Sequence, residues 1–175
     1  MNSMRLLKHL LLPLVAAGVF VFAAAPAFGD DAKAPGDVIA TLQQAGKFGT
    51  FLKAVNAAGL TRTLRKGTYT VFAPTDDAFA KLAPGTLDDL MKIENKAKLV
   101  RLVQYHIVPR ELPASAFAKT SSPTHTAETL AKMTITFSSD NSGAMVNGAR
   151  IEATDLKASN GVIHTIDTVL TPPQQ

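Results

Sequence analysis

The residues best suited to chemistry are three histidines outside the N-terminal stretch, His106, His125 and His164. An imidazole can transfer protons near neutral pH or bind a metal ion. A metal site needs several converging ligands, however, and these histidines stand in three unrelated sequence contexts. The absence of cysteine excludes thiol catalysis and thiolate-bound metal. Because the sequence also lacks H-E-x-x-H, G-x-S-x-G, P-loop and G-x-G-x-x-G motifs, we expect no metal, no cofactor and no enzymatic activity.

Two of these histidines fall among apolar residues. His106 continues a helical stripe, and His164 alternates with apolar residues on one strand face; the companions are Leu99, Leu102 and Val103 for the first, and Val162, Ile166 and Leu170 for the second. We interpret both as partly buried histidines whose ring nitrogens bond to backbone or neighbouring groups. His164 and Asp167 would point to opposite strand faces, so a hydrolase built on these residues ranks far behind.

An acidic residue beside an aliphatic one, Asp155 and Leu156, forms a different kind of candidate site. The pair lies in "EATDLKASNG", which we interpret as a polar loop between two strands. An exposed acid next to an aliphatic side chain can act as a recognition pair in such a loop. An ordinary turn aspartate is the alternative, and the local sequence by itself favours that alternative.

The N-terminus has the layout of a secretory signal peptide. Arg5 and Lys8 precede an uncharged apolar run from Leu10 to Ala25, and small residues follow in "APAFGDD". The run is interrupted by Pro13 and is shorter than the roughly 20 residues of a spanning helix. We therefore expect cleavage after Ala27 or Gly29, no membrane span afterwards, and a secreted protein, periplasmic or extracellular. The expected organisation is a signal peptide over 1–29, a linker over 30–36, one domain over 37–173 and a tail at 174–175.

The charge pattern gives no indication of nucleic-acid binding. The full chain carries a formal charge of +4, and the leader removes Arg5 and Lys8, so the mature protein is nearly neutral. The remaining charges read as dispersed, without a basic stripe or interleaved aromatic residues. Nucleic acid is therefore not an expected partner.

The first half of the expected domain reads as helices around one strand. Apolar spacing and turn residues predict helices over Asp37–Ala45, Phe48–Ala58, Thr86–Met91 with Thr86 as cap, and Asn95–His106, and a strand over Thr68–Phe72. After the strand stops at Pro74, Thr75 and Asp76 are expected to accept hydrogen bonds from the N–H groups of the next helix, and Phe79 is expected to face the core. This stretch is thus a capped strand-to-helix corner.

The second half reads as β-structure after an irregular connection. Residues Arg110 to Thr129 contain two prolines and several Ser and Thr, which is typical of a long loop. "MTITFSSD" alternates, Asn147-Gly148 is a strong hairpin signal, and Asn160-Gly161 introduces "VIHTIDTVL". Helices followed by hairpins, with one early strand, predict an α+β fold.

Three motifs in order carry a resemblance to a known family. "TVFAPTDDAF" resembles the first signature of the fasciclin-like domain family, "YHIV" resembles its Tyr-His motif, and "NGARIEATDLKASNGVIHTIDTVLTP" resembles its second signature. The matching signature positions are Thr70, Val71, Phe72, Ala73, Pro74, Thr75, Asp76, Phe79, Asn160, Gly161, His164, Ile166 and Asp167. The resemblance covers about Gly36 to Pro173, as in a single-domain bacterial export product.

This resemblance implies a fasciclin-like β-wedge of two sheets packed against a layer of helices, with the two signature strands together in the core. In adhesive members an Asp-Ile pair and the Tyr-His motif are implicated in receptor contact. The matching residues here are Asp155, Leu156, Tyr105 and His106. Leu replaces Ile in the first pair, and Asp76 stands where Asn is common.

Two functions follow from these features. The first is a secreted, non-enzymatic adhesion or interaction module that binds a protein or a cell-surface or matrix component. The second is a carrier of a small apolar ligand such as a carotenoid, in which the segment Arg110–Thr129 covers a groove between wedge and helices.

Overall fold

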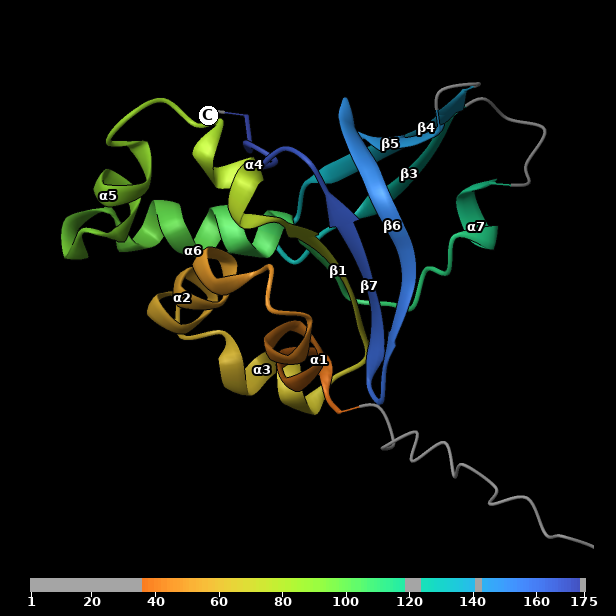
Figure 1. Cartoon of the computed structure of the whole chain (residues 1–175), viewed down its shortest axis with the longest axis horizontal. Helices are drawn as coiled ribbons and strands as arrows, with labels where there is room; N and C mark the ends of the chain where they lie inside the picture. The colour runs from red at the N-terminus through yellow and green to blue at the C-terminus, as the bar shows by residue number, and fades with distance from the viewer. Residues whose placement is uncertain (1–35, 119–123, 141–142, 174–175) are drawn as a thin grey trace, which may run out of the picture. The chain divides into compact units, whose positions relative to one another are not determined.

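A computed structural model describes residues 36–118, 124–140 and 143–173. The predicted signal peptide, nearly all of the linker and the tail at 174–175 lie outside these residues. The fold is α+β, with a mixed sheet on one side and a layer of helices against it (Figure 1), as the sequence predicted. Within the described residues, no helix is long and apolar enough to cross a membrane.

The helical layer begins with three short helices, α1 (Val38–Ala45), α2 (Gly49–Ala57) and α3 (Thr61–Lys66). The Asp37 side chain caps α1 by accepting from Ala40 N at 2.8 Å, and α1 ends at the left-handed Gly46. Helix α3 is not among the helices predicted from the sequence. Its single buried residue is Leu64, so it lacks an amphipathic stripe that a periodicity search detects.

The remaining helices of the layer follow the first strand; they are α4 (Asp76–Ala80), α5 (Thr86–Met91), the 3₁₀ turn η1 (Ile93–Asn95) and α6 (Lys96–Tyr105). The Thr75 side chain caps α4, as predicted, by accepting from Ala78 N at 3.2 Å. The prediction that Thr86 caps α5 is wrong, because the cap position belongs to the left-handed Gly85 and Thr86 is the first helical residue.

In the part of the chain that the structure describes, seven strands form one mixed sheet in the order β2-β1-β7-β6-β5-β4-β3. Their bounds are β1 (Tyr69–Pro74), β2 (Ile107–Val108), β3 (Thr124–Glu128), β4 (Thr134–Asp140), β5 (Gly143–Val146), β6 (Ala149–Ala158) and β7 (Gly161–Ile166). The long strand β6 pairs with β7 on one side and β5 on the other. It therefore connects β2, β1 and β7 to β5, β4 and β3, and the two sheets expected for the wedge are two halves of one sheet that is continuous through β6 (Figure 1). The predicted two-residue turn between β5 and β6 is present, with positive φ at Asn147 and Gly148.

The two signature strands pair directly. β1 runs parallel to β7, with Phe72 opposite His164 and Pro74 opposite Ile166, so the expected meeting of the signatures in the core is confirmed. The start of this pairing needs glycine at 161, because a Cβ there would collide with the Tyr69 carbonyl oxygen, and φ at Gly161 is +150°. All six β7 residues are buried.

Apolar side chains gather on both faces of β1 and β7. Val71 and Ile163 face the helices, where Phe51 and Leu64 are fully buried. Phe72 faces the inside of the wedge, where it packs on Phe137 at a ring-centroid distance of 5.4 Å. Because alternate residues of a strand point to opposite faces, these central strands separate two apolar clusters.

The prediction of an irregular connection from Arg110 to Thr129 is wrong. Helix α7 (Ser115–Ala118) and strand β3 lie within it, and residues 119–123 are outside the described part. β3 reads as a loop in the sequence because its inward apolar residue is the small Ala127. It becomes a strand by pairing with β4 from Thr124 to Glu128.

Candidate functional site

Asp155 and Leu156 lie within strand β6, not in the predicted loop. The pairing of β6 with β7 shifts register between Ala153 and Leu156, and Asp155 has φ of +59°. This β-bulge turns the strand locally and redirects side chains. The error arose because the solvent-facing residues of β6 after Ile151 are mostly polar, and a polar exposed strand has the composition of a loop.

The bulge is held from two directions. Asp155 N–H donates to Nδ1 of His164 at 3.3 Å, and Asp155 Oδ1 accepts from Ala114 N at 2.8 Å. The Leu156 side chain is left 37% exposed, and the other large apolar residue exposed in the described structure is Ile93, at 92%. The bulge therefore presents an exposed carboxylate and an aliphatic side chain in a defined arrangement.

A strap of five residues, Arg110–Ala114, lies next to the bulge and is bound to several strands. The Thr70 hydroxyl donates to Arg110 O and accepts from Leu112 N, both at 2.7 Å. His164 Nε2 lies 2.8 Å from Leu112 O. These bonds join the strap to β1 and β7, and the Asp155 carboxylate joins it to β6.

His164 connects the bulge to the strap from inside the wedge. Its side chain is fully buried and stacks on Phe72 with ring centroids 5.3 Å apart. Because a carbonyl can only accept and an amide can only donate, Nε2 carries the proton toward Leu112 and Nδ1 accepts from Asp155. Burial lowers the pKa of His164, against the opposing effects of the Leu112 bond and the Asp155 charge. The ring is therefore a neutral connector.

The Tyr-His motif lies inside the fold. Tyr105 is 4% exposed and His106 is 0% exposed, so the prediction that these side chains touch a partner is not supported. His106 Nδ1 donates to Leu102 O at 2.8 Å and Nε2 accepts from Leu170 N at 3.0 Å. Burial lowers the pKa of His106 to about 4, although the bond to Leu102 acts in the opposite direction.

Tyr105 supports the hairpin between β5 and β6. Its hydroxyl accepts from Asn147 Nδ2 at 2.7 Å and lies 3.4 Å from Thr134 O, to which it donates. Both members of the motif therefore bind parts of the chain that are distant in sequence. The ring nitrogens of His106 and His164 are satisfied as predicted, but both histidines are fully buried rather than partly buried.

Asp76 caps a helix other than the predicted one. Its carboxylate accepts from Thr50 N at 2.7 Å and from Gly49 N at 3.2 Å, so it caps α2 rather than α4. Burial tends to raise the pKa of Asp76, but these hydrogen bonds, with a contribution from the Lys53 charge, lower it overall. No local pattern indicates this partner, which lies 26 residues away.

The second signature also serves structure. Asn160 Oδ1 accepts from Val38 N, and its Nδ2 donates to Leu64 O and Gly67 O, which joins β7 to the helical layer. Asp167 Oδ1 accepts from Arg150 N at 2.9 Å. For Asp167, burial tends to raise the pKa, while bonds from Thr168, Arg150 N and Lys81 lower it overall.

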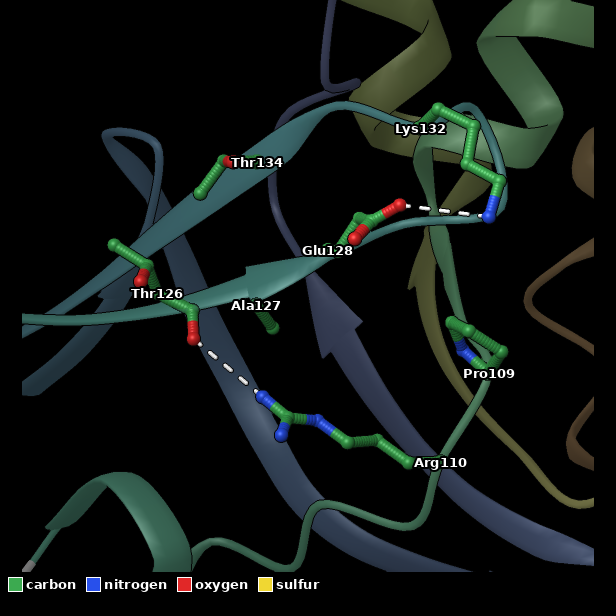
Figure 2. Close-up of a pocket in the computed structure, with 7 residues that line it drawn as sticks. All are labelled: Pro109, Arg110, Thr126, Ala127, Glu128, Lys132 and Thr134. Carbon is green, nitrogen blue, oxygen red and sulfur yellow. Dashed lines mark hydrogen bonds and ion pairs between the residues drawn. The ribbon is translucent and has the colours of Figure 1, made fainter.

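A groove of about 400 Å³ lies between the start of the strap and the outer strand β3. Figure 2 shows Arg110 reaching from the strap across this groove to Thr126, where its Nη2 donates to the carbonyl at 3.4 Å. Lys132 and Glu128 pair at its other end, 3.5 Å apart. A charged side chain over an outer strand discourages pairing with another chain.

The chemistry available to these side chains is recognition and structural support. Among residues 36–118, 124–140 and 143–173, no three His, Asp or Glu side chains converge in a way that could hold a metal ion.

A mixed sheet folded about a bulged strand and covered by helices defines the class of α+β wedge domains. The model of the Fasciclin domain matches residues 46–172, and the chain belongs to this family.

Relatives and a solved structure agree with this assignment. The chain is 42% identical over 127 residues to protein sll1483 of Synechocystis, covering 72% of this chain and 68% of that protein. It is 36% identical to the transforming growth factor-beta-induced protein ig-h3 of Sus scrofa, covering 79% of this chain but 20% of the relative. It is 33% identical to the immunogenic protein MPB70 of Mycobacterium bovis, covering 65% of this chain and 55% of that protein.

A FAS1 domain pair from the insect cell adhesion molecule Fasciclin I has a similar structure, with a TM-score of 0.56. The match covers 74% of this chain and 47% of that one, at 16% sequence identity. This likeness concerns the fold, and it places the wedge described above among known FAS1 structures.

Proposed function

We propose that this protein is an exported, non-enzymatic interaction module that contacts a protein or a cell-surface or matrix component through the bulge of β6. The observation that carries the proposal is the exposure of Leu156 beside the Asp155 carboxylate on a bulge held by hydrogen bonds. An arrangement that is already ordered loses less conformational freedom when a partner binds. Membership of the Fasciclin family supports the proposal.

The surroundings of the pair suit a partner that offers an apolar pocket and a hydrogen-bond donor or cation. Leu156 supplies an aliphatic side chain, and Asp155 supplies a carboxylate whose orientation the Ala114 N–H restricts. Glu152, Thr154 and Lys157 are exposed on the same strand. A small apolar centre with a polar rim is the usual composition of a protein interface.

The two buried histidines support the non-enzymatic part of the proposal. Each ring uses one nitrogen to donate to a backbone carbonyl and the other to accept from a backbone N–H. A general acid or base must instead reach the proton that it transfers. His106 and His164 are therefore better suited to holding the fold together than to reacting with a substrate.

The decisive experiment measures binding of the purified protein to immobilised envelope and matrix material from its own host, with three variants. Leu156→Ala removes the aliphatic contact, and Asp155→Asn removes the charge while keeping an acceptor for Ala114 N. Ile93→Ala is the matched control, because it removes the other large apolar side chain that is exposed among the described residues. We expect the first two to weaken binding about five-fold or more and the control to bind like the parent.

Equal binding by parent and Leu156→Ala would remove the bulge from the mechanism, as would an equal loss in Ile93→Ala.

Export is tested separately by N-terminal sequencing of the protein produced in its host. We expect a chain that starts at Phe28 or Asp30, and an intact N-terminus would contradict the proposed leader.

A carrier of a small apolar ligand is the second candidate, and one cavity favours it. A space of about 390 Å³ lies beside α5, α6 and the C-terminal segment; its lining residues are Thr86, Leu90, Lys98, Arg101, Leu102, Thr171, Pro172 and Pro173. The groove beside the strap suits such a ligand less well, because charged and hydroxyl side chains line most of it. A visible absorption band in natively purified protein would support carriage of a carotenoid, and a colourless preparation from a pigmented host would contradict it.

A further inference from the structure

The charges of the chain are less evenly distributed than the dispersed pattern expected above. Between Val38 and Thr75 the sequence contains no Asp or Glu, but it contains five basic residues: Lys47, Lys53, Arg62, Arg65 and Lys66. All five are exposed, and they belong to α2, α3 and the segment before α2. This part of the helical layer therefore carries an excess of positive charge at its surface.

A groove of about 350 Å³ lies among the first three helices, within this basic region. Each helix contributes side chains from one face, because residues separated by three or four positions lie side by side on a helix. The contributors are Ile39 and Gln43 from α1, Leu52, Lys53 and Asn56 from α2, and Thr61 and Arg65 from α3. The site exists only because the three helices pack together.

The lining combines three kinds of group. Lys53 and Arg65 supply positive charge, the amides of Gln43 and Asn56 and the hydroxyl of Thr61 supply hydrogen-bond donors and acceptors, and two aliphatic residues supply apolar surface. The aliphatic residues are Ile39, which is 3% exposed, and the partly buried Leu52.

The acidic neighbours of the groove are already engaged in caps. Asp37 caps α1, and its Oδ2 lies 3.6 Å from Arg65 Nε, in a pair whose Arg65 side chain is 53% exposed and whose Asp37 side chain is 27% exposed. Asp76 caps α2, and the Lys53 charge contributes to lowering its pKa. Exposed ion pairs are weak, so both cations can add interactions with an anion that enters the groove.

We propose that the groove binds a sugar-acid unit of an anionic polysaccharide. Its carboxylate pairs with Lys53 and Arg65, its hydroxyls bond to the amides and to Thr61, and the apolar face of the sugar ring lies on Leu52. Lys47, Arg62 and Lys66 attract neighbouring acidic units of the polymer. This surface belongs to the helices and is separate from the β6 bulge, so the inference does not depend on the proposed function.

The lining favours this polymer over two other anionic partners. None of the seven lining residues is aromatic, whereas binding of single-stranded nucleic acid relies on aromatic stacking. The aliphatic lining residues are buried or partly buried, and insertion into an anionic membrane needs exposed apolar side chains. An acidic sugar offers hydroxyl groups to the amides and the hydroxyl of the lining, and a carboxylate to its two cations.

The test is calorimetric titration of the purified full-length protein with polygalacturonate at low and raised salt, with neutral dextran as the uncharged comparison. We expect polygalacturonate to bind, dextran not to bind, and raised salt to weaken the affinity. Lys53→Gln and Arg65→Gln should each raise the Kd about five-fold or more. Asn56→Ala should raise it measurably without any change of charge.

Lys132→Gln is the matched control, because Lys132 is exposed and paired with Glu128 at 3.5 Å, much as Arg65 is paired with Asp37. It should leave the Kd unchanged. An equal loss in Lys132→Gln, an unaltered Kd in both Lys53→Gln and Asn56→Ala, or no binding of polygalacturonate at low salt would each overturn the proposal. Tighter binding of single-stranded DNA or of anionic vesicles through the same residues would assign the groove to another partner and overturn it as well.

Thermal unfolding of every variant separates loss of binding from loss of fold. If Arg65→Gln lowers the Tm through the Asp37 cap, Lys53→Gln and Asn56→Ala decide the outcome, because both side chains are exposed. The bulge variants Asp155→Asn and Leu156→Ala should retain polygalacturonate binding. The two surfaces can therefore be confirmed or rejected independently.

Discussion

Asp155 N–H donates a hydrogen bond of 3.3 Å to Nδ1 of the buried His164. The same imidazole bonds through Nε2 to Leu112 O in the strap. One fully buried side chain thus sets the positions of two surface segments, the bulge of β6 and the strap. The exposed pair Asp155 and Leu156 is arranged from beneath the surface rather than by its own neighbours in sequence.

From the bulge we predict that alanine at position 155 is less stable than asparagine. Asp155→Ala should lower the free energy of unfolding by about 2 kcal/mol, because alanine tolerates positive φ poorly and the bond to Ala114 N is lost. Asp155→Asn should cost less than about 0.5 kcal/mol, because asparagine tolerates this conformation and keeps an acceptor. Denaturation with urea measures both values.

Asp155→Gly separates the two contributions, because glycine removes the backbone strain but not the missing acceptor. Its cost should fall between those of asparagine and alanine. If alanine were as stable as asparagine, neither the left-handed backbone nor the bond to the strap would contribute to stability.

Burial of His106 predicts loss of stability in weak acid. Its pKa is about 4 in the folded protein, compared with about 6.5 in the unfolded chain. Between pH 6.5 and 4, His106 is therefore protonated in the unfolded chain but stays neutral in the folded protein. Because the unfolded state binds more protons, the free energy of unfolding falls as the pH falls through this range. The contribution of this histidine reaches about 3 kcal/mol at pH 4.

Urea denaturation at several pH values, for the parent and for His106→Gln, isolates this contribution. Glutamine does not titrate, so the variant should lose less stability between pH 7 and 4 even if its stability at pH 7 is lower. Parallel pH profiles for the two proteins would exclude His106 as the source.

Because Asp76 belongs to α4 but caps α2, we predict that substituting it destabilises α2. Asp76→Ala should lower the free energy of unfolding by about 1 to 2 kcal/mol, because Gly49 N and Thr50 N lose their acceptor. Asp76→Asn keeps one acceptor oxygen and should cost less. Asp77→Ala is the control, since this exposed neighbour in α4 should contribute less than about 0.5 kcal/mol, and similar costs for Asp76→Ala and Asp77→Ala would argue against the cap.

We predict that adding a single methyl group at Gly161 lowers the free energy of unfolding by a large amount. Gly161→Ala should cost at least about 3 kcal/mol or prevent folding, because the added Cβ meets the Tyr69 carbonyl at the start of the pairing between β1 and β7. Gly59→Ala provides the comparison, since Gly59 also has positive φ but open space around it, and it should cost about 1 kcal/mol. Circular dichroism and thermal unfolding measure both, and equal Tm values would refute the steric argument.

Features that depend on a few neighbouring residues were predictable from the sequence. The strand-to-helix corner at Pro74 and Thr75, the cap at Asp37 and the Asn147-Gly148 turn all appear where local chemistry places them. Their bonds close within one turn of chain. The stripe of α6 likewise predicted the burial of His106, because helical periodicity alone identifies the face that turns inward.

Other features needed the tertiary structure. Whether the polar stretch around Asp155 is a loop or a strand depends on its pairing with β7, and β3 exists through its pairing with β4. Asp76 was a plausible cap in the sequence, but the helix that it caps is 26 residues away. The basic groove combines side chains of three helices, which no local pattern brings together.

The sequence by itself therefore determined the type of fold, most of its helices, its turns and its buried stripes, because short-range sterics, capping and periodicity decide these features. Only the tertiary structure decided which surfaces are available for binding. The burial of Tyr105, the bulge at Asp155 and the grouping of Lys53 with Arg65 depend on segments distant in sequence, because exposure and shape are set by whatever packs alongside a residue in space.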